Sequence, residues 1–127
     1  MILFIDTTDF NSMHLALIDK QNVTEHVFTI SYNANYKTLD FIAKFLKKEG
    51  VLSSKPSVLK KIIVCSGPGS FTGTRVGVTL AGALGFGWKL PVSAIPKNKI
   101  PKDLSRLWPI KTIPKLTVAY SPSKFDK

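Results

Sequence analysis

The segment that most constrains the fold of this chain is a glycine-rich turn at residues 66–77, which reads SGPGSFTGTRVG. An apolar run at 62–65 precedes it and predicts a short buried strand, and the stretch that continues to residue 88 is long enough for a helix. Glycine supplies the backbone freedom of the turn, while Ser70 or Thr72 can accept hydrogen bonds from the first free amides of the helix. Because such a helix start can hold an anion, the turn predicts a candidate anion-binding loop.

The turn does not match either of the two common phosphate-binding loops. A Walker loop has four residues between its glycines and then lysine, whereas five residues separate Gly67 from Gly73 here and Thr74 follows. A dinucleotide-binding loop that starts at Gly67 and Gly69 would need glycine at position 72, which is threonine. An anion site at this turn would therefore differ from both motifs.

The first part of the chain predicts a meander and a helix. Apolar runs at 2–5, 14–18 and 23–30 are separated by polar turns, which is typical of three antiparallel strands. An amphipathic pattern at 36–49 predicts a helix, and Gly50 is placed to close it.

The second part adds a strand at 62–65, a helix at 72–88 and a strand at 92–95. The complete order is βββαβαβ, which predicts an α/β fold with a mixed sheet and helices. This order resembles the ribonuclease H-like half of the actin and sugar-kinase ATPases, which normally have two such halves. We expect one domain at 1–95, and an irregular, basic, proline-rich tail at 96–127 as the vestige of a second half.

The two predicted helices carry a candidate protein interface. In the second helix, small residues recur every four positions and share one narrow face. Glycine costs about 1 kcal/mol relative to alanine in a helix, so close contact with another backbone has to compensate. The other backbone belongs either to a partner subunit or to the same domain, in its sheet or its first helix. The candidate interface residues are Leu39, Ile42, Ala43, Leu46, Gly73, Gly77, Ala81 and Gly85.

Three motifs together resemble the TsaB (YeaZ) family: IDTT at 5–8, GPGSFTGTRVG at 67–77 and GFGWKLPV at 85–92. The resemblance implies a protein similar to TsaD, the subunit that makes the threonylcarbamoyladenosine modification of tRNA, but without catalytic activity of its own. It also implies pairing with a TsaD-like subunit or with a second copy through the two helices, and contact with tRNA through the complex.

A second candidate site follows the first strand. In actin-like ATPases an aspartate at this place faces the metal and the nucleotide phosphates, and the resemblance gives Asp6 that position. The alternative is an aspartate that stabilises its own turn by accepting hydrogen bonds from nearby amides. We expect no bound cofactor, because ATP is normally held between two halves. The weak anion or nucleotide site would comprise Asp6, Thr7, Thr8, Gly69, Ser70 and Thr72.

No catalytic or metal-binding residues are expected in the sequence. The histidines that bind metal in TsaD fall close to Lys97 and Pro101, and neither residue can replace an imidazole ligand. His14 and His26 have no cysteine or second histidine at metal-ligand spacing, and Cys65 has no activating base nearby in the sequence. We therefore expect that the protein is not an enzyme.

The charge of the chain, +10 in total, is concentrated in the tail at 96–127, which has eight basic and two acidic residues. This composition is typical of a solvated tail, and it also suits a polyanion such as tRNA. An alternative function is thus a small basic RNA-binding module in which Trp108, Tyr120 and the tail lysines contact RNA. Another is a homodimer that has lost the family role.

The expected location is the cytoplasm. A single cysteine cannot form an intramolecular disulfide, and the first residues do not resemble a secretion signal. The long apolar stretch at 76–88 is shorter than the roughly 20 residues that a membrane-spanning helix needs, so no membrane association is expected.

Overall fold

The computed structural model describes residues 1–9, 11–20, 22–29, 38–51, 58–69 and 71–108. Within these residues, five strands form one sheet in the order β3-β2-β1-β4-β5. The elements are β1 (Ile2–Asp6), β2 (Ser12–Ile18), β3 (Val23–Thr29), α1 (Thr38–Lys48), β4 (Lys61–Cys65), α2 (Phe71–Trp88), β5 (Val92–Ile95) and the 3₁₀ turns η2 (Lys97–Lys99) and η3 (Leu104–Leu107). The predicted mixed α/β fold and its element order are confirmed.

The sheet joins an antiparallel meander to a parallel part. Strand β2 pairs antiparallel with both β1 and β3, while β4 pairs parallel with β1 and β5. Parallel strands need crossover connections, which α2 provides between β4 and β5. The carboxyl ends of β1, β4 and β5 therefore meet at one edge, where Asp6, Cys65 and Ile95 end their strands.

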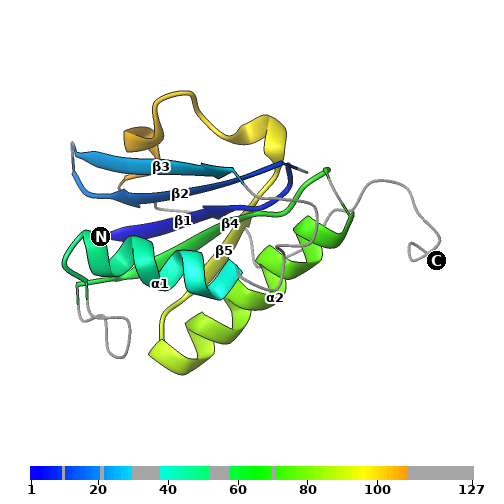
Figure 1. Cartoon of the computed structure of the whole chain (residues 1–127). Helices are drawn as coiled ribbons and strands as arrows, with labels where there is room; N and C mark the ends of the chain where they lie inside the picture. Colours follow the sequence, from blue (N-terminus) through cyan, green and yellow to red (C-terminus); the bar gives the residue numbers. More distant parts are fainter. Residues whose placement is uncertain (10, 21, 30–37, 52–57, 70, 109–127) are drawn as a thin grey trace.

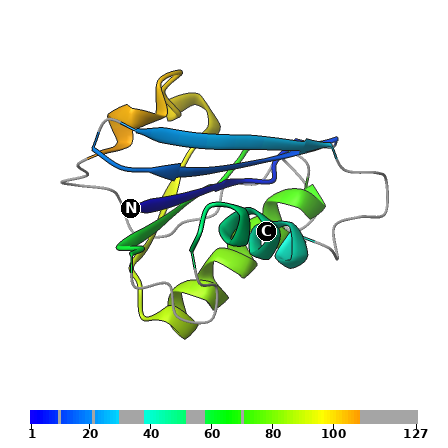
Figure 2. The same ribbon diagram turned by 60° about the vertical axis from the view of Figure 1, so that its left-hand side comes forward.

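Helices α1 and α2 cover the same face of the sheet (Figures 1 and 2). Because side chains alternate along a strand, every second residue of β1, β2 and β4 points into this layer. Helix α1 closes as predicted at Gly50, whose φ is +77°. The amides of Gly50 and Val51 bond the carbonyls of Lys47 and Leu46, a Schellman arrangement that satisfies the last turn. The buried core of this face comprises Leu3, Ile5, Met13, Leu15, Leu17, Ile42, Phe45, Leu46, Val51, Leu59, Ile62, Val64, Val78 and Ala81.

Three of the four small residues on the narrow face of α2 lie against the domain's own sheet, which is the alternative to a subunit interface. Ala81 is fully buried, and a Cβ added to Gly77 or Gly85 would overlap Thr7 Oγ1 or Val92 Cγ2. The spacing did indicate close backbone approach, but the partner is the sheet that α2 crosses over.

In α1, Ile42 and Leu46 are likewise buried in the core. An amphipathic helix turns its apolar stripe to the domain core whenever a sheet lies next to it. Ala43 is partly exposed and Leu39 is 50% exposed, so these two of the four expected α1 interface residues remain accessible.

The opposite face of the sheet is covered by residues 96–108, which extends the domain beyond the boundary expected at residue 95. Pro96 and Pro101 prevent a regular helix, as expected, and two short 3₁₀ turns form instead. In η3, Leu104 and Leu107 are three residues apart, so both reach the apolar layer above β1 and β2. The side chain of Asp103 caps this turn by accepting from the amide (3.0 Å) and hydroxyl (2.7 Å) of Ser105.

Two expectations for the tail meet different outcomes. Trp108, which the RNA-binding alternative places in contact with RNA, is partly buried and packs on the same apolar layer as Leu104. The strand expected at 116–120, together with Tyr120, lies outside the described residues. In the described part of the chain, the helices are too short or too polar to span a lipid bilayer.

Replacing Leu104 tests whether residues 96–108 belong to the folded domain. Leu104→Ala removes a side chain that is 4% exposed, and we expect it to lower the free energy of unfolding by about 3 kcal/mol. Urea denaturation followed by circular dichroism measures this change. Lys102→Ala, two residues away on the exposed surface, is the control and should unfold like the wild type. Equal midpoints for the two variants would contradict the packing of η3 on the sheet.

Candidate functional site

The candidate site lies where the parallel strands end, the edge at which open α/β sheets usually bind ligands. Strand β1 ends at Asp6, the glycine-rich turn leaves β4, and Lys97 follows β5. Backbone hydrogen bonds join these ends. The amide of Ser66 donates to the carbonyl of Ile95, and the amide of Lys97 donates to the carbonyl of Gly67, both at 2.9 Å.

Both oxygens of the Asp6 carboxylate accept hydrogen bonds, one from its own turn and the other from a lysine. Its Oδ1 accepts from the amide (2.9 Å) and the hydroxyl (2.7 Å) of Thr8. Its Oδ2 accepts from Lys97 Nζ at 3.1 Å, and the same ammonium donates to Thr8 Oγ1 at 2.9 Å. The side chain of Asp6 is 10% exposed and that of Lys97 is 45% exposed, so the ion pair is open to solvent on the lysine side.

Two pKa shifts follow from this arrangement. Burial alone would raise the pKa of Asp6, but the hydrogen bonds from Thr8 and the ammonium of Lys97 outweigh it, and the pKa lies below its ordinary value. Burial and the nearby carboxylate of Asp6 raise the pKa of the Cys65 thiol. The thiol is therefore protonated at neutral pH.

The glycine-rich turn packs directly on the segment after β1. Thr7 Oγ1 donates to the carbonyl of Gly73 at 2.5 Å, near the start of α2. A Cβ added to Gly69 would overlap Thr8, at 2.6 Å from both its Cβ and its carbonyl oxygen. The structure thus brings Asp6, Thr7, Thr8 and Gly69 together. Ser70 and the side chain of Thr72 lie outside the described residues, so the predicted helix cap stays a prediction.

Lys97 of this site and the buried Thr74 of α2 had no assigned part in the sequence interpretation. Lys97 was considered because it stands where a metal-binding histidine would be, and its pairing with Asp6 across 91 residues has no local sequence signal. Thr74 is fully buried at the first turns of α2, and its hydroxyl has no hydrogen-bond partner in the described structure.

The site as folded is an internal ion pair. The positive charge that an incoming anion would use is already shared with Asp6, and the carboxylate oxygens that a cation would use accept from Thr8 and Lys97. This geometry corresponds to the turn-stabilising alternative for Asp6, with an additional link to β5. In the described part of the chain, no three His, Cys, Asp or Glu side chains gather closely enough to hold a metal ion.

Two glycines of α2 provide a matched test of the packing beneath the site. Gly77→Ala places a methyl group on Thr7 Oγ1 and displaces its bond to Gly73, so we expect a loss of about 1–3 kcal/mol in the free energy of unfolding. Gly82→Ala meets no atom within 4 Å and should stabilise the helix by up to about 1 kcal/mol. Chemical denaturation measures the free energy of unfolding of both variants. Stabilisation by Gly77→Ala would refute the close approach of α2 to Thr7.

The ion pair predicts a pH dependence of stability. Because the pKa of Asp6 in the folded protein lies below the ordinary 3.8, the ionised carboxylate stabilises the fold above the unfolded pKa. This contribution is lost as the pH falls through the folded pKa. Asp6→Asn should therefore be less stable at neutral pH and lose less stability on acidification, as measured by urea denaturation from about pH 7 to about pH 3. Parallel pH curves for variant and wild type would count against the Asp6–Lys97 link.

Comparison with known proteins identifies related sequences and structures. The family model described as TsaD, tRNA N6-adenosine threonylcarbamoyltransferase, matches residues 34–100, slightly more than half of the chain. The tRNA threonylcarbamoyladenosine biosynthesis protein TsaB of Bacillus subtilis (strain 168) is 34% identical over 95 residues, which is 74% of this chain and 40% of the relative.

Solved structures show the same fold. YeaZ from Pseudomonas aeruginosa superposes with a TM-score of 0.64 at 26% identity, over 75% of this chain and 43% of that protein. A second structure from Pseudomonas aeruginosa, of a protein with similarity to peptidase YeaZ, gives 0.65 at 26% identity, over 75% of this chain and 42% of its own. The chain spans about two fifths of the length of these relatives. By its family match, its turn sequence and its fold, the chain belongs to the TsaB (YeaZ) family of TsaD-like proteins.

Proposed function

We propose that this protein is a non-catalytic partner subunit in tRNA threonylcarbamoyladenosine modification, and that it pairs with a TsaD-like subunit through α1 and α2. The observation that carries the proposal is the family match over the region that contains both helices, residues 34–100. A homodimer through the same helices is the second form of the proposal. The chain meets tRNA through the complex, and it acts in the cytoplasm, where tRNA is modified.

The outer faces of the two helices support an interface of this kind. Since the inner faces pack on the sheet, the partner would contact the accessible residues of the same helices. Phe86 is 89% exposed at the end of α2, and Leu39 is 50% exposed at the start of α1. Exposed aromatic and aliphatic side chains are typical anchors of protein interfaces. Both helices lie on one side of the sheet, so one partner can cover both (Figure 1).

The site at the strand ends supports a subunit without chemistry of its own. The carboxylate that actin-like ATPases direct toward metal and phosphate is here paired with Lys97. Lys97 and Pro101 stand close to the positions where the resemblance to TsaD implies metal-binding histidines. Cys65 is fully buried with a raised pKa, so it does not provide a nucleophile.

Sedimentation velocity of the chain, alone and mixed with TsaD from the same organism, tests the proposal. We expect a one-to-one complex, and Phe86→Asp should weaken it by about tenfold or more because a charge replaces an exposed aromatic anchor. Val27→Asp, an equal charge change at a residue 55% exposed on β3, is the control and should pair like the wild type.

Outcomes of this experiment separate the two forms of the proposal. A dimer of the chain alone that Phe86→Asp dissociates, without binding of TsaD, would support the homodimer. A chain that stays monomeric in the presence of TsaD, or pairing that Phe86→Asp leaves intact, would refute the helix interface.

A further inference from the structure

Residues 96–108 cover the sheet with their apolar side chains and turn their basic side chains to solvent. Leu104 and Leu107 are buried against the strands, and two further apolar side chains of the segment pack on the same layer. The four basic residues of the segment, at positions 97, 99, 102 and 106, are all exposed. The face of the domain opposite α1 and α2 therefore carries a row of positive charges.

Three of these four charges are available to a partner. The ammonium of Lys97 is paired with Asp6 at 3.1 Å. Within the described residues, no ion pair engages the other three. We call these three side chains the basic surface: Lys99, Lys102 and Arg106.

A single acidic residue, Asp103, interrupts the segment. Its Oδ1 accepts from the amide and the hydroxyl of Ser105, so this oxygen is used to cap η3. Residues 109–127 add four lysines and one aspartate to the sequence. The positive sign of the segment is thus maintained along the rest of the chain.

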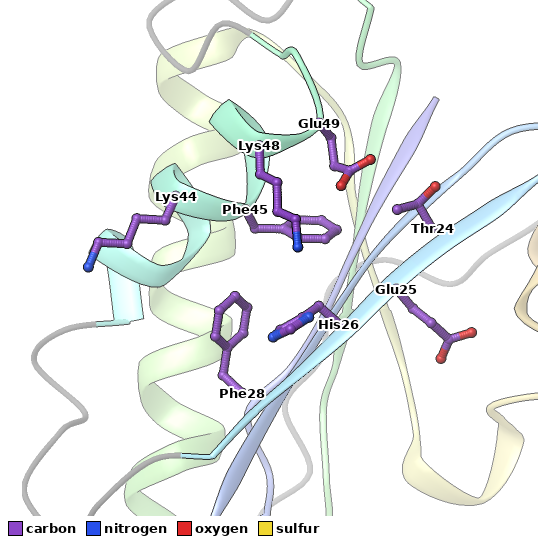
Figure 3. Close-up of a pocket in the computed structure, with 8 residues that line it drawn as sticks. All are labelled: Thr24, Glu25, His26, Phe28, Lys44, Phe45, Lys48 and Glu49. Atoms are coloured by element: carbon purple, nitrogen blue, oxygen red, sulfur yellow. The ribbon is translucent and has the colours of Figure 1, made fainter.

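The lysines of α1 form no comparable surface. They stand beside a hollow of about 220 Å³ between α1 and β3, which is lined by as many acidic side chains as lysines. Figure 3 shows that Lys44 points away from this hollow, and that Lys48 is followed at the end of the helix by Glu49. The α1 lysines therefore provide a comparison of equal charge on the opposite side of the domain.

The composition of the basic surface favours a phosphate backbone over a protein or a membrane. The large apolar side chains exposed in the described structure are Val27, Leu39, Val58 and Phe86, and none of them belongs to 96–108. A protein interface is built around apolar or aromatic anchors, and a segment that binds a membrane surface inserts apolar side chains into it. Phosphate contacts need only positive charge and hydrogen-bond donors.

The packing of this segment also determines the kind of nucleic-acid contact. Proteins that read single-stranded RNA stack its bases on aromatic rings. Trp108 packs on the apolar layer of the sheet, so the basic surface offers lysine and arginine without a stacking platform. Contacts of this type position a nucleic acid without reading its sequence, and they weaken steeply with salt.

We propose that the basic surface binds the phosphate backbone of tRNA directly. The choice of tRNA rests on the proposed function, while the contact is made by this chain's own residues. Residues 96–108 lie on the face of the sheet opposite the two helices, as Figure 2 shows, so a partner on α1 and α2 leaves the basic surface accessible.

Fluorescence anisotropy of a labelled, unmodified tRNA transcript measures this contact, with the full chain alone and KCl varied from about 50 to about 200 mM. In the triple variant Lys99→Ala/Lys102→Ala/Arg106→Ala we expect binding at least about tenfold weaker at the lower salt. The slope of log affinity against log salt should fall by about 3, because each lost phosphate contact lowers it by about 1.

The control is Lys44→Ala/Lys47→Ala/Lys48→Ala, which removes the same three charges from exposed positions of α1. It should change the affinity by less than about threefold. Because all six substitutions are at exposed side chains, both variants should keep the circular dichroism spectrum of the wild type.

Four results would overturn the proposal. Equal weakening by both triple variants would mean attraction by net charge without a defined surface. Full binding by the variant at 99, 102 and 106 would assign the contact to other residues. Wild-type binding that is absent or independent of salt would exclude phosphate contacts. Binding to phosphatidylserine vesicles in place of tRNA would identify a membrane surface.

These measurements are independent of the pairing experiment. TsaD is absent from them, so a chain that fails to bind tRNA can still pair through α1 and α2. A chain that fails to pair with TsaD can likewise still bind tRNA through the opposite face. The two proposals therefore fail separately.

Discussion

The close approach of α2 to the end of β1 holds the rest of this structure in place. Gly77 leaves room for the side chain of Thr7, and the Thr7 hydroxyl then reaches the carbonyl of Gly73. That contact fixes the start of α2 relative to the first strand, so the turn from β4 passes directly over Thr8 at Gly69. A larger side chain at Gly77 would separate these layers and with them the whole edge that carries Asp6. Glycine destabilises a helix relative to alanine, but at this position a larger residue would collide with the sheet.

The sequence predicted the positions of the helices and strands well, but it predicted less well which of them pack against each other. Alternation and helical periodicity are local properties, and they located β1 to β5, α1 with its Gly50 cap, and α2 to within a few residues. The four-residue spacing of small residues also indicated correctly that another backbone comes close. It could not identify which one, because a narrow face fits a sheet of the same chain as well as a helix of another.

The features that could not be predicted from the sequence are contacts between segments far apart in the chain. Lys97 pairs with Asp6 across 91 residues, and no spacing rule connects a lysine after the last strand with a carboxylate after the first. Prolines correctly excluded a regular helix at 96–108, yet they say nothing about where the segment packs. Leu104 and Leu107 settle that question, because two apolar side chains on one 3₁₀ turn can be buried on the uncovered face of the sheet.

The same packing determines where a partner can bind. Both faces of the sheet are covered, one by α1 and α2 and the other by residues 96–108 (Figure 2). At the strand ends, the carboxylate of Asp6 is already paired with Lys97. What the described structure leaves accessible includes the outer side of the helices, with Phe86, and the outer side of residues 96–108, with its basic side chains. These surfaces differ in chemistry, since the first offers apolar anchors and the second offers positive charge.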